Sequence, residues 1–197
     1  EELLAKMTLE EKIGQMTQID FSVIGAPAGQ NLDAPIDKAK LEDAIIAHHV
    51  GSILNTPTTP QNKAQSIEMW REITQSVQAV SAKSRLKIPV IYGIDAIHGA
   101  TYTKNAVLFP QAINMAATFN PELSFKEGEI TARELRASGL QWNFSPVMDI
   151  GRQPLWPRLW ETYGEDVHLA SMLGASYIKG HQGVDSSASN KALTCLK

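Results

Sequence analysis

The clearest pattern in the chain is a stripe of apolar side chains between positions 60 and 84. These side chains recur at spacings of three and four: Ile67, Trp70, Ile73, Val77 and Val80. This spacing is typical of one face of an α-helix, and Pro60 suits the first turn of a helix. We therefore predict a helix over 60–84 with Trp70 in the core.

Further helices are predicted from end signals rather than from periodicity. Thr8-Leu-Glu-Glu11 is a capping box, so a helix should begin near Thr8 and continue an apolar face through Ile13, Met16 and Phe21. Asn120-Pro121 is typical of a helix start, and Gly139 of a helix end. Two more helices are expected over 38–48 and 165–179.

Short apolar runs between these helices predict buried strands. Four such runs occur, at 50–54, 89–95, 140–148 and 192–197. Strands that alternate with helices indicate an α/β fold with a parallel sheet. Gly25 and Gly29 form no GxGxxG pattern, which argues against an open dinucleotide-binding sheet.

A closed arrangement fits the chain better. A (β/α)8 barrel of the TIM type needs about 250 residues, and the 197 residues here hold four predicted strands and long loops. We therefore expect α/β architecture with only about the first half of a barrel. In this interpretation residues 1–197 are the amino-terminal part of one barrel domain that is truncated at Lys197.

Composition narrows the possible functions. The chain is 43% hydrophobic and carries a formal net charge of -3 without a long basic run, so nucleic acid is not an expected partner. No stretch approaches the roughly 20 apolar residues of a membrane span, and no membrane association is expected. Cys195 is the only cysteine and cannot form an internal disulfide.

Polar side chains with possible chemistry gather at the predicted strand ends. Asp95, Asp149 and Lys197 end three strands, and Arg158 lies in the long loop 151–164. In a barrel these positions converge on one face. Carboxylates beside cations suit a ligand rich in hydroxyl groups, such as a sugar. In the simpler alternative, the acids cap turns, Arg158 pairs with Glu161 and Lys197 is solvated.

Several motifs, in order, resemble the amino-terminal barrel of glycoside hydrolase family three, the family of β-glucosidases and exo-β-glucanases. The resemblance covers nearly the whole chain. Its motifs are Thr8-Leu-Glu-Glu-Lys-Ile-Gly-Gln-Met16, Gly93-Ile-Asp-Ala-Ile-His-Gly99, Phe109-Pro-Gln-Ala112 with Ala116-Ala-Thr-Phe-Asn-Pro-Glu-Leu123, Phe144-Ser-Pro-Val-Met-Asp149, positions 156–166 and Leu193-Thr-Cys-Leu-Lys197.

The resemblance implies roles for three residues in the terminal sugar subsite. Asp95 matches the aspartate that hydrogen-bonds the distal hydroxyls, Arg158 an arginine of the same subsite, and Lys197 the lysine of a Lys-His pair whose histidine would follow it. The loop departs from the family's Pro-Arg-Trp-Gly-Arg wording, with Leu155 and Pro157 at the first arginine and the glycine.

The resemblance places no catalytic residue in this chain. The family uses a nucleophilic aspartate and a glutamate acid/base, and both are expected beyond Lys197. Glu161 is instead expected to support Arg158, while Glu165 and Asp166 should be first-turn acids of a helix.

Histidines and tryptophans leave alternatives open. His98 could contact ligand or form a structural hydrogen bond, and we assign it a supporting place. The other histidines (His48, His49, His168 and His181) lack metal-binding spacing, so neither metal nor cofactor is expected. Trp156 and Trp160 could stack on a sugar or anchor the loop.

The expected function of the full-length protein is retaining hydrolysis of terminal non-reducing β-D-glucosyl residues from β-glucans or oligosaccharides. The chain alone should be inactive. Within the family, an N-acetylglucosaminidase or a xylosidase is the alternative. By resemblance, the protein should be periplasmic or secreted.

A different class of function is a non-catalytic half-barrel that binds sugar or assembles with a partner. A half-barrel exposes an unpaired sheet edge. Such a chain should self-associate or pair with the remaining chain.

Overall fold

A computed structural model describes residues 1–26, 35–57 and 64–197. The expectations for Pro60, Gly29 and part of the loop 56–60 lie outside these residues. The chain divides into two compact units. The first comprises Glu1–Lys63 and Glu68–Gly93, and the second comprises Ala64–Ile67 and Ile94–Lys197.

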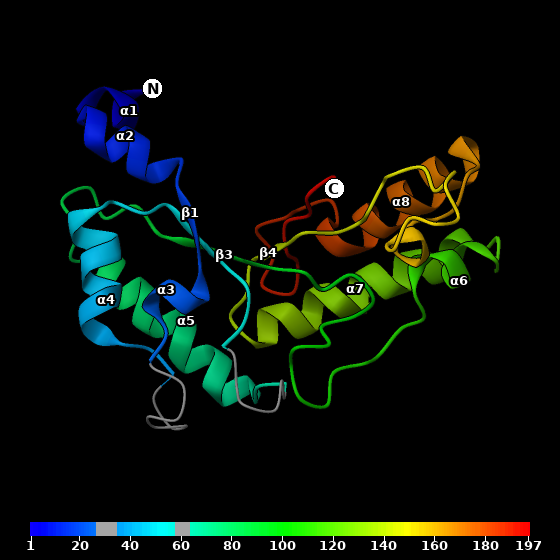
Figure 1. Cartoon of the computed structure of the whole chain (residues 1–197), viewed down its shortest axis with the longest axis horizontal. Helices are drawn as coiled ribbons and strands as arrows, with labels where there is room; N and C mark the ends of the chain where they lie inside the picture. The colour runs from blue at the N-terminus through cyan, green and yellow to red at the C-terminus, as the bar shows by residue number, and fades with distance from the viewer. Residues whose placement is uncertain (27–34, 58–63) are drawn as a thin grey trace. The chain divides into compact units, whose positions relative to one another are not determined.

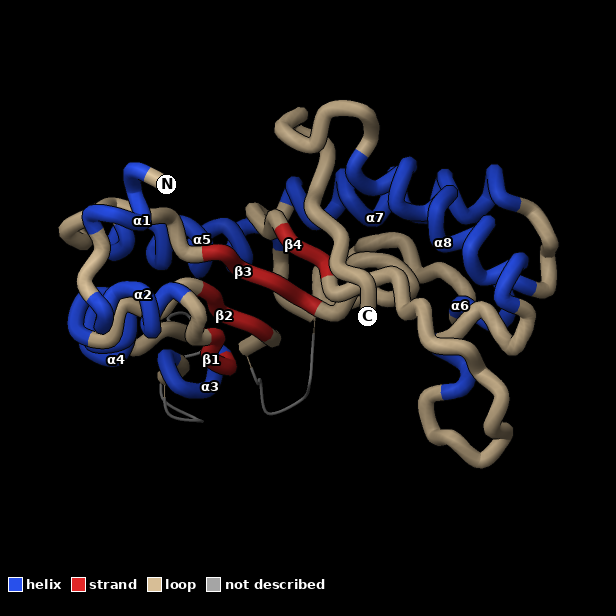
Figure 2. The backbone as a smooth tube through the Cα atoms, turned by 90° about the horizontal axis from the view of Figure 1, so that it is seen from above, coloured by secondary structure: helices blue, strands red, loops and turns tan. Residues whose placement is uncertain are grey.

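The first unit is built on a parallel sheet. The first three strands of this sheet are β1 (Gln18–Asp20), β2 (Ser52–Leu54) and β3 (Ile91–Ile94), the last of which ends in the second unit. The fourth strand is β4 (Trp142–Asn143), and the order is β1-β2-β3-β4. The register aligns Ile19 with Ile53 and Ile53 with Tyr92. Figure 2 shows the three strands side by side. The strands expected near 50–54 and 89–95 are confirmed, whereas β1 was not predicted because three residues carry no visible period.

The apolar stripe belongs to α5 (Ile67–Ser81), which supplies much of the core of the first unit. Trp70, Ile73, Val77 and Val80 are buried, and the Trp70 ring packs edge-on against Tyr92 with ring centroids 5.9 Å apart. The predicted stripe is therefore confirmed. The helix starts later than predicted, because residues 64–66 are not helical.

The remaining helices of the first unit are short. They are α1 (Glu2–Lys6), α2 (Leu9–Gln15), α3 (Phe21–Ile24) and α4 (Lys38–Glu42), which continues as a π-helix over Asp43–Ala47. The helix expected over 38–48 is thus confirmed, with its second half wound more loosely.

The capping box at Thr8 is present as predicted. The Glu11 N–H donates to Thr8 Oγ1 over 3.2 Å, and the Thr8 N–H donates to Glu11 Oε2 over 2.8 Å. The apolar face predicted for this helix is wrong, because Ile13 and Met16 are 53% and 80% exposed and Phe21 lies in α3. Glu11 is the buried side chain instead, because it pairs with Arg85.

Two long helices, α7 (Pro121–Ala137) and α8 (Val167–Gln182), dominate the second unit and lie side by side (Figure 1). Glycines permit this approach: a Cβ on Gly128 would lie 2.3 Å from the Tyr177 carbonyl oxygen, and one on Gly180 2.0 Å from that of Phe125. Asn120 caps α7 and the chain turns at Gly139 with φ +80, as the sequence predicts. A shorter helix, α6 (Ala112–Ala116), precedes α7.

The two last predicted strands are mostly extended backbone rather than regular strand. β4 covers only Trp142–Asn143, and its Trp142 forms a single parallel bridge with Leu193. Beyond it, the Lys197 N–H donates to the Pro146 carbonyl over 3.3 Å. Pro146 has no N–H to donate, so the ladder cannot continue regularly. The segment 192–197 therefore follows 141–148 without becoming a strand.

Candidate sugar-binding site

Asp95 directly follows β3, and its carboxylate pairs with the last residue of the chain. Lys197 Nζ donates a hydrogen bond to Asp95 Oδ1. The Asp95 and Lys197 side chains are 30% and 32% exposed, so the pair is partly shielded yet reachable. The fold therefore joins two predicted site residues that are 102 positions apart in sequence.

Arg158 is held by Glu161 in the loop 151–164. Arg158 Nε donates to Glu161 Oε2 over 2.9 Å, and a second guanidinium nitrogen contacts the same oxygen. A 3-10 turn over Leu159–Glu161 brings the two side chains together, because positions three apart stand above each other in such a turn. The expected Arg158–Glu161 pair is present.

Electrostatics link this pair to the strand-end carboxylates. The pKa of Arg158 is raised, first by its hydrogen bond to Glu161 and then by the charges of Glu161, Asp95 and Asp149. Such charge effects act only over short range in a screened medium. Within the second unit, Asp95 is thus bonded to Lys197 and Arg158 to Glu161, and the charges of Asp95 and Asp149 act on Arg158.

The loop 151–164 is closed at its base. The Gly151 N–H donates to the Gly164 carbonyl over 3.0 Å, and Gly164 adopts φ +96, a conformation that favours glycine. Trp160 is 50% exposed, so it is not a core residue, whereas Trp156 is partly buried. An exposed aromatic on a closed loop beside charged groups can stack on an apolar sugar face.

His98 is engaged in a backbone contact. Its Nδ1 lies 3.1 Å from the Phe109 carbonyl oxygen, and the Phe109 N–H donates to the His98 carbonyl over 3.0 Å. Since a carbonyl oxygen only accepts, Nδ1 carries the proton. His98 therefore closes the loop 99–109 at its base. Of the two roles that the sequence left open for His98, the structural hydrogen bond is present.

Two further residues at this site were not singled out from the sequence. Burial raises the pKa of Tyr102, and the charges of Asp95 and Glu161 raise it further. Asn143 is buried in β4 and bonds the backbone of Ala96. A carboxamide inside an apolar strand run was the one signal that could have drawn attention to Asn143.

Two other acids lie at or in the long helices. Asp166 is the N-cap of α8 and accepts from the Leu169 N–H over 2.7 Å. The expectation that Glu165 and Asp166 lie in the first turn is wrong, because α8 begins at Val167. Burial raises the pKa of Glu127 in α7 to about 8, so this carboxyl is neutral at pH 7. Within 1–26, 35–57 and 64–197, no three His, Cys, Asp or Glu side chains converge as metal ligands.

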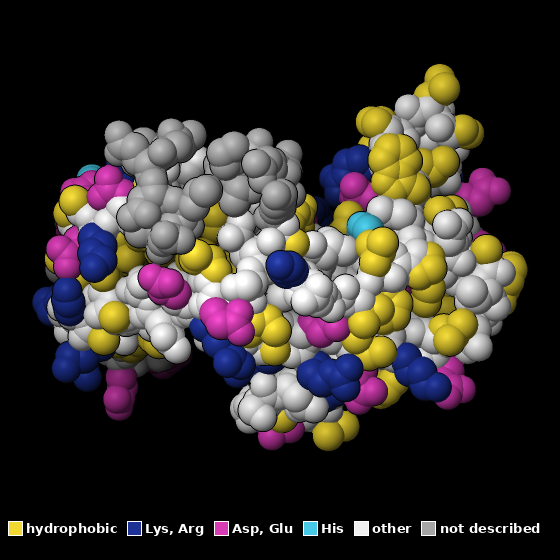
Figure 3. Space-filling model, turned by 90° about the horizontal axis from the view of Figure 1, so that it is seen from below, with side chains coloured by type: hydrophobic (Ala, Val, Ile, Leu, Met, Phe, Trp, Pro, Cys, Tyr) yellow, Lys and Arg dark blue, Asp and Glu magenta, His cyan; other side chains and the backbone are white. Residues whose placement is uncertain are grey.

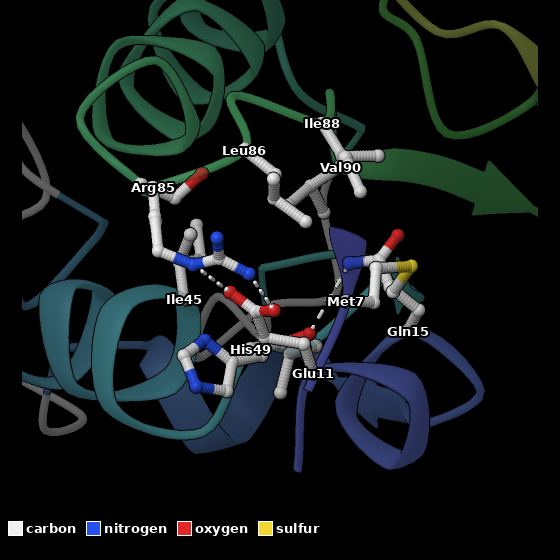
Figure 4. A pocket seen from close by; sticks show the side chains of 11 residues that line it. Met7, Glu11, Gln15, Ile45, His49, Arg85, Leu86, Ile88 and Val90 are labelled. Atoms are coloured by element: carbon white, nitrogen blue, oxygen red, sulfur yellow. Dashed lines mark hydrogen bonds and ion pairs between the residues drawn. The ribbon is translucent and has the colours of Figure 1, made fainter. Parts of the chain in front are cut away.

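A pocket in the first unit holds an ion pair rather than an open site (Figure 4). Arg85 Nε donates to Glu11 Oε1 over 2.9 Å and a second nitrogen donates to the Lys6 carbonyl over 2.7 Å. The Arg85 hydrogen bond and the Thr8 N–H lower the pKa of Glu11 to about 2. The pocket is thus occupied by the Glu11–Arg85 ion pair, which connects α2 to the segment after α5.

Basic and acidic side chains are interspersed on the face shown in Figure 3, and neither sign of charge is concentrated there. None of the helices in the described parts of the chain has the length and apolar character required to cross a bilayer.

Comparison with known proteins identifies the family. A profile of the glycosyl hydrolase family 3 N terminal domain matches residues 8–194. The chain is 38% identical over 190 residues to a lysosomal beta glucosidase of Dictyostelium discoideum, covering 94% of this chain and 23% of that protein. It is 32% identical over 196 residues to a periplasmic beta-glucosidase of Salmonella typhimurium, covering 100% and 22%.

Solved structures agree. The exo-1,3/1,4-beta-glucanase of a Pseudoalteromonas species matches with TM-score 0.82 and 29% identity over 100% of this chain and 24% of that one. The parallel α/β arrangement is therefore part of a TIM-type barrel, as expected. The chain spans about a quarter of the length of the curated relatives it matches. By these matches, the chain belongs to glycosyl hydrolase family 3 and is part of its N-terminal domain.

Proposed function

We propose that the protein to which this chain belongs hydrolyses terminal non-reducing β-D-glucosyl residues of β-glucans or oligosaccharides with retention. In this proposal Asp95, Arg158 and Lys197 form part of the subsite for the terminal sugar. The observation that carries it is the Asp95–Lys197 pair beside Arg158 in a family 3 N-terminal domain.

The chemistry of the cluster suits a monosaccharide. The ionised Asp95 carboxylate only accepts hydrogen bonds, and sugar hydroxyls can donate to it, whereas Lys197 and Arg158 only donate. Because the Asp95 and Lys197 side chains are about one third exposed, each retains open positions for a ligand. Charge-assisted hydrogen bonds of this kind are about twice as strong as neutral ones, which favours a tightly oriented sugar.

The catalytic pair is proposed to come from residues that follow Lys197. A retaining glycosidase needs two carboxyl groups about 5 Å apart, one as nucleophile and one as acid/base. The candidate acids Glu161 and Asp166 are occupied by Arg158 and by the start of α8. The chain on its own should therefore bind sugar weakly and hydrolyse nothing.

The location is proposed to be outside the cytoplasm, periplasmic or secreted. One relative carries the name of a periplasmic enzyme and another that of a lysosomal one, which supports a compartment beyond the cytoplasm. Activity or antibody signal in the periplasmic or culture fraction of the source cells would agree, and a purely cytoplasmic signal would contradict it.

A substrate panel tests the activity. The whole protein is assayed with aryl β-glucoside, β-xyloside and N-acetyl-β-glucosaminide, and the anomer released first is identified by proton NMR. We expect the β-glucoside to react fastest with β-glucose as first product. Faster cleavage of the xyloside or the glucosaminide would support the alternative specificity, and no cleavage of any would favour a binding or assembly role.

The Asp95→Ala variant tests the subsite. Removing the carboxylate leaves the Lys197 ammonium without its partner and the sugar without a charge-assisted bond, so kcat/KM should fall about a hundredfold or more. The matched control is Asp185→Asn, since this exposed acid bonds only Ser187 of its own loop among the described contacts. Turnover by Asp95→Ala close to that of the control would refute the assignment of Asp95.

A further inference from the structure

A buried polar cluster connects the two chain segments that carry Asp95 and Lys197. It consists of Asn143 in β4 with Tyr177 and His181 in α8, all at most 1% exposed. The Tyr177 and His181 rings stack with centroids 5.5 Å apart. Burying three polar side chains costs free energy unless each is hydrogen-bonded, so their partners decide what the cluster does.

The carboxamide of Asn143 bonds both backbone groups of Ala96, the residue after Asp95, as a neighbouring strand would. Its Oδ1 accepts from the Ala96 N–H over 3.0 Å, and its Nδ2 donates to the Ala96 carbonyl over 3.1 Å. The preceding link is a backbone bond, because the Phe144 N–H donates to the Ile94 carbonyl over 2.9 Å. The backbone is therefore held on both sides of Asp95.

The second hydrogen of Asn143 Nδ2 reaches α8. Asn143 Nδ2 lies 3.1 Å from the Tyr177 hydroxyl oxygen and 3.3 Å from His181 Nε2. His181 Nδ1 lies 2.9 Å from the Ala192 carbonyl, which only accepts, so Nδ1 carries the proton and Nε2 is the acceptor for Asn143. Burial lowers the pKa of His181 to about 4, which keeps this neutral tautomer at physiological pH.

The end of α8 also holds the segment that leads to Lys197. The Ala192 N–H donates to the His181 carbonyl over 3.3 Å. Gln182 Oε1 accepts from the Thr194 N–H over 3.0 Å and from its hydroxyl over 2.6 Å. His181 thus fixes the start of the segment whose last side chain pairs with Asp95.

We propose that Asn143 and His181 are positioning residues that hold the Asp95 and Lys197 segments in register, and so set the geometry of the sugar subsite. Neither touches the ligand. Each acts through a neighbour: Asn143 through Ala96 and His181 through Ala192. This inference rests on the proposed function, since it assigns the pair to the same subsite.

The test compares His181→Ala with His181→Asn in the whole protein. An asparagine amide can reproduce the donation of Nδ1 to the Ala192 carbonyl, whereas alanine cannot. With an aryl β-glucoside, KM should rise about tenfold in His181→Ala and return to within about threefold of the parent in His181→Asn. KM is informative because it does not depend on how much of the enzyme is folded.

Ser124→Ala is the matched control. Ser124 in α7 is equally buried and donates to the Leu173 carbonyl of α8 over 2.9 Å, and the described contacts give it no bond to Asn143 or His181. It should lower the melting temperature and leave KM unchanged. An equal rise of KM in Ser124→Ala and His181→Ala would mean a merely structural role and overturn the inference.

The double variant Asp95→Asn/His181→Ala tests whether His181 affects KM through Asp95. Once the Asp95 carboxylate is gone, its exact placement matters less, so adding His181→Ala should change KM by less than about threefold. Independent effects that multiply would show that His181 does not act through the Asp95 subsite.

Hydrogen exchange separates failure of this inference from failure of the proposed function. In Asn143→Leu and His181→Ala, the Ala96 amide should exchange about tenfold faster or more than in the parent, because its acceptor is lost or released. Unchanged exchange would overturn the positioning role even in an active enzyme. Faster exchange in a protein that cleaves no glycoside would refute the proposed activity alone.

Discussion

At the residue scale, Arg158 shows how one side chain is aimed by another. Two of its nitrogens contact the same Glu161 oxygen, so the planar guanidinium is held rather than left to rotate. The charges of Asp95 and Asp149 add to that of Glu161 in raising the pKa of Arg158. The two departures from the family sequence pattern are Leu155, which is 89% exposed, and Pro157, which directly precedes Arg158. The Arg158–Glu161 pair forms despite both.

Arg158→Lys tests whether this planar pair matters. Lysine keeps the charge and loses the two-nitrogen contact with Glu161, so kcat/KM on a β-glucoside should fall about tenfold or more. Arg133→Lys is the matched control, because Arg133 is exposed on α7. Equal activity of the two variants would show that Arg158 acts only as a charge.

At the element scale, α2 is fixed by an ion pair instead of an apolar face. Glu11 is 7% exposed, while Ile13 beside it is 53% exposed. The carboxylate satisfies the Thr8 N–H and the Arg85 guanidinium together. This arrangement explains why hydrophobic spacing misplaced the buried side of this helix: a charged residue with two hydrogen-bonding partners can be buried where an apolar neighbour is not.

Glu11→Gln tests the Glu11–Arg85 ion pair through the pH dependence of the melting temperature. The folded pKa of about 2 lies below the ordinary glutamate value of 4.5, so ionised Glu11 stabilises the fold above about pH 4.5 and this contribution is lost as pH falls toward 2. The variant should melt lower than the parent at pH 7, and the gap should narrow below about pH 4.5. Calorimetry measures both.

The control for this experiment is Glu72→Gln, because Glu72 is exposed on α5. Its melting temperature should follow that of the parent across the same pH range. A gap for Glu11→Gln that persists unchanged at pH 3 would contradict the role given to the ion pair.

At the scale of the whole molecule, the parallel sheet has an edge. Within the described residues β1 is paired on one side, with β2, and the chain from α1 to the residue after α2 exposes apolar side chains. These are Leu3, Leu4, Leu9, Ile13 and Met16. Unpaired strand edges and apolar surface promote association.

The chain 1–197 produced alone is therefore expected to sediment as an oligomer. Association should weaken in the whole protein, where the rest of the barrel is available to cover these surfaces. Sedimentation velocity over a tenfold range of concentration measures it. A folded, monodisperse monomer of 21.6 kDa would contradict the expectation.

Much of this organisation follows from the sequence alone, because it depends on local chemistry. The stripe on α5, the caps at Thr8, Asn120 and Asp166, and the α/β order are each encoded within a few neighbouring residues. The family motifs single out Asp95, Arg158 and Lys197 in the same way, because each motif is a short run of neighbouring residues.

The tertiary structure alone decided how distant residues pair. Whether Lys197 meets Asp95, whether Glu11 is buried by Arg85, and how Asn143 links Ala96 to His181 all depend on contacts between residues far apart in the chain. The preference of a short segment for helix or strand does not depend on residues far along the chain, so it cannot predict such contacts. The short β1 has the same cause, since a strand exists only through the neighbour that pairs with it.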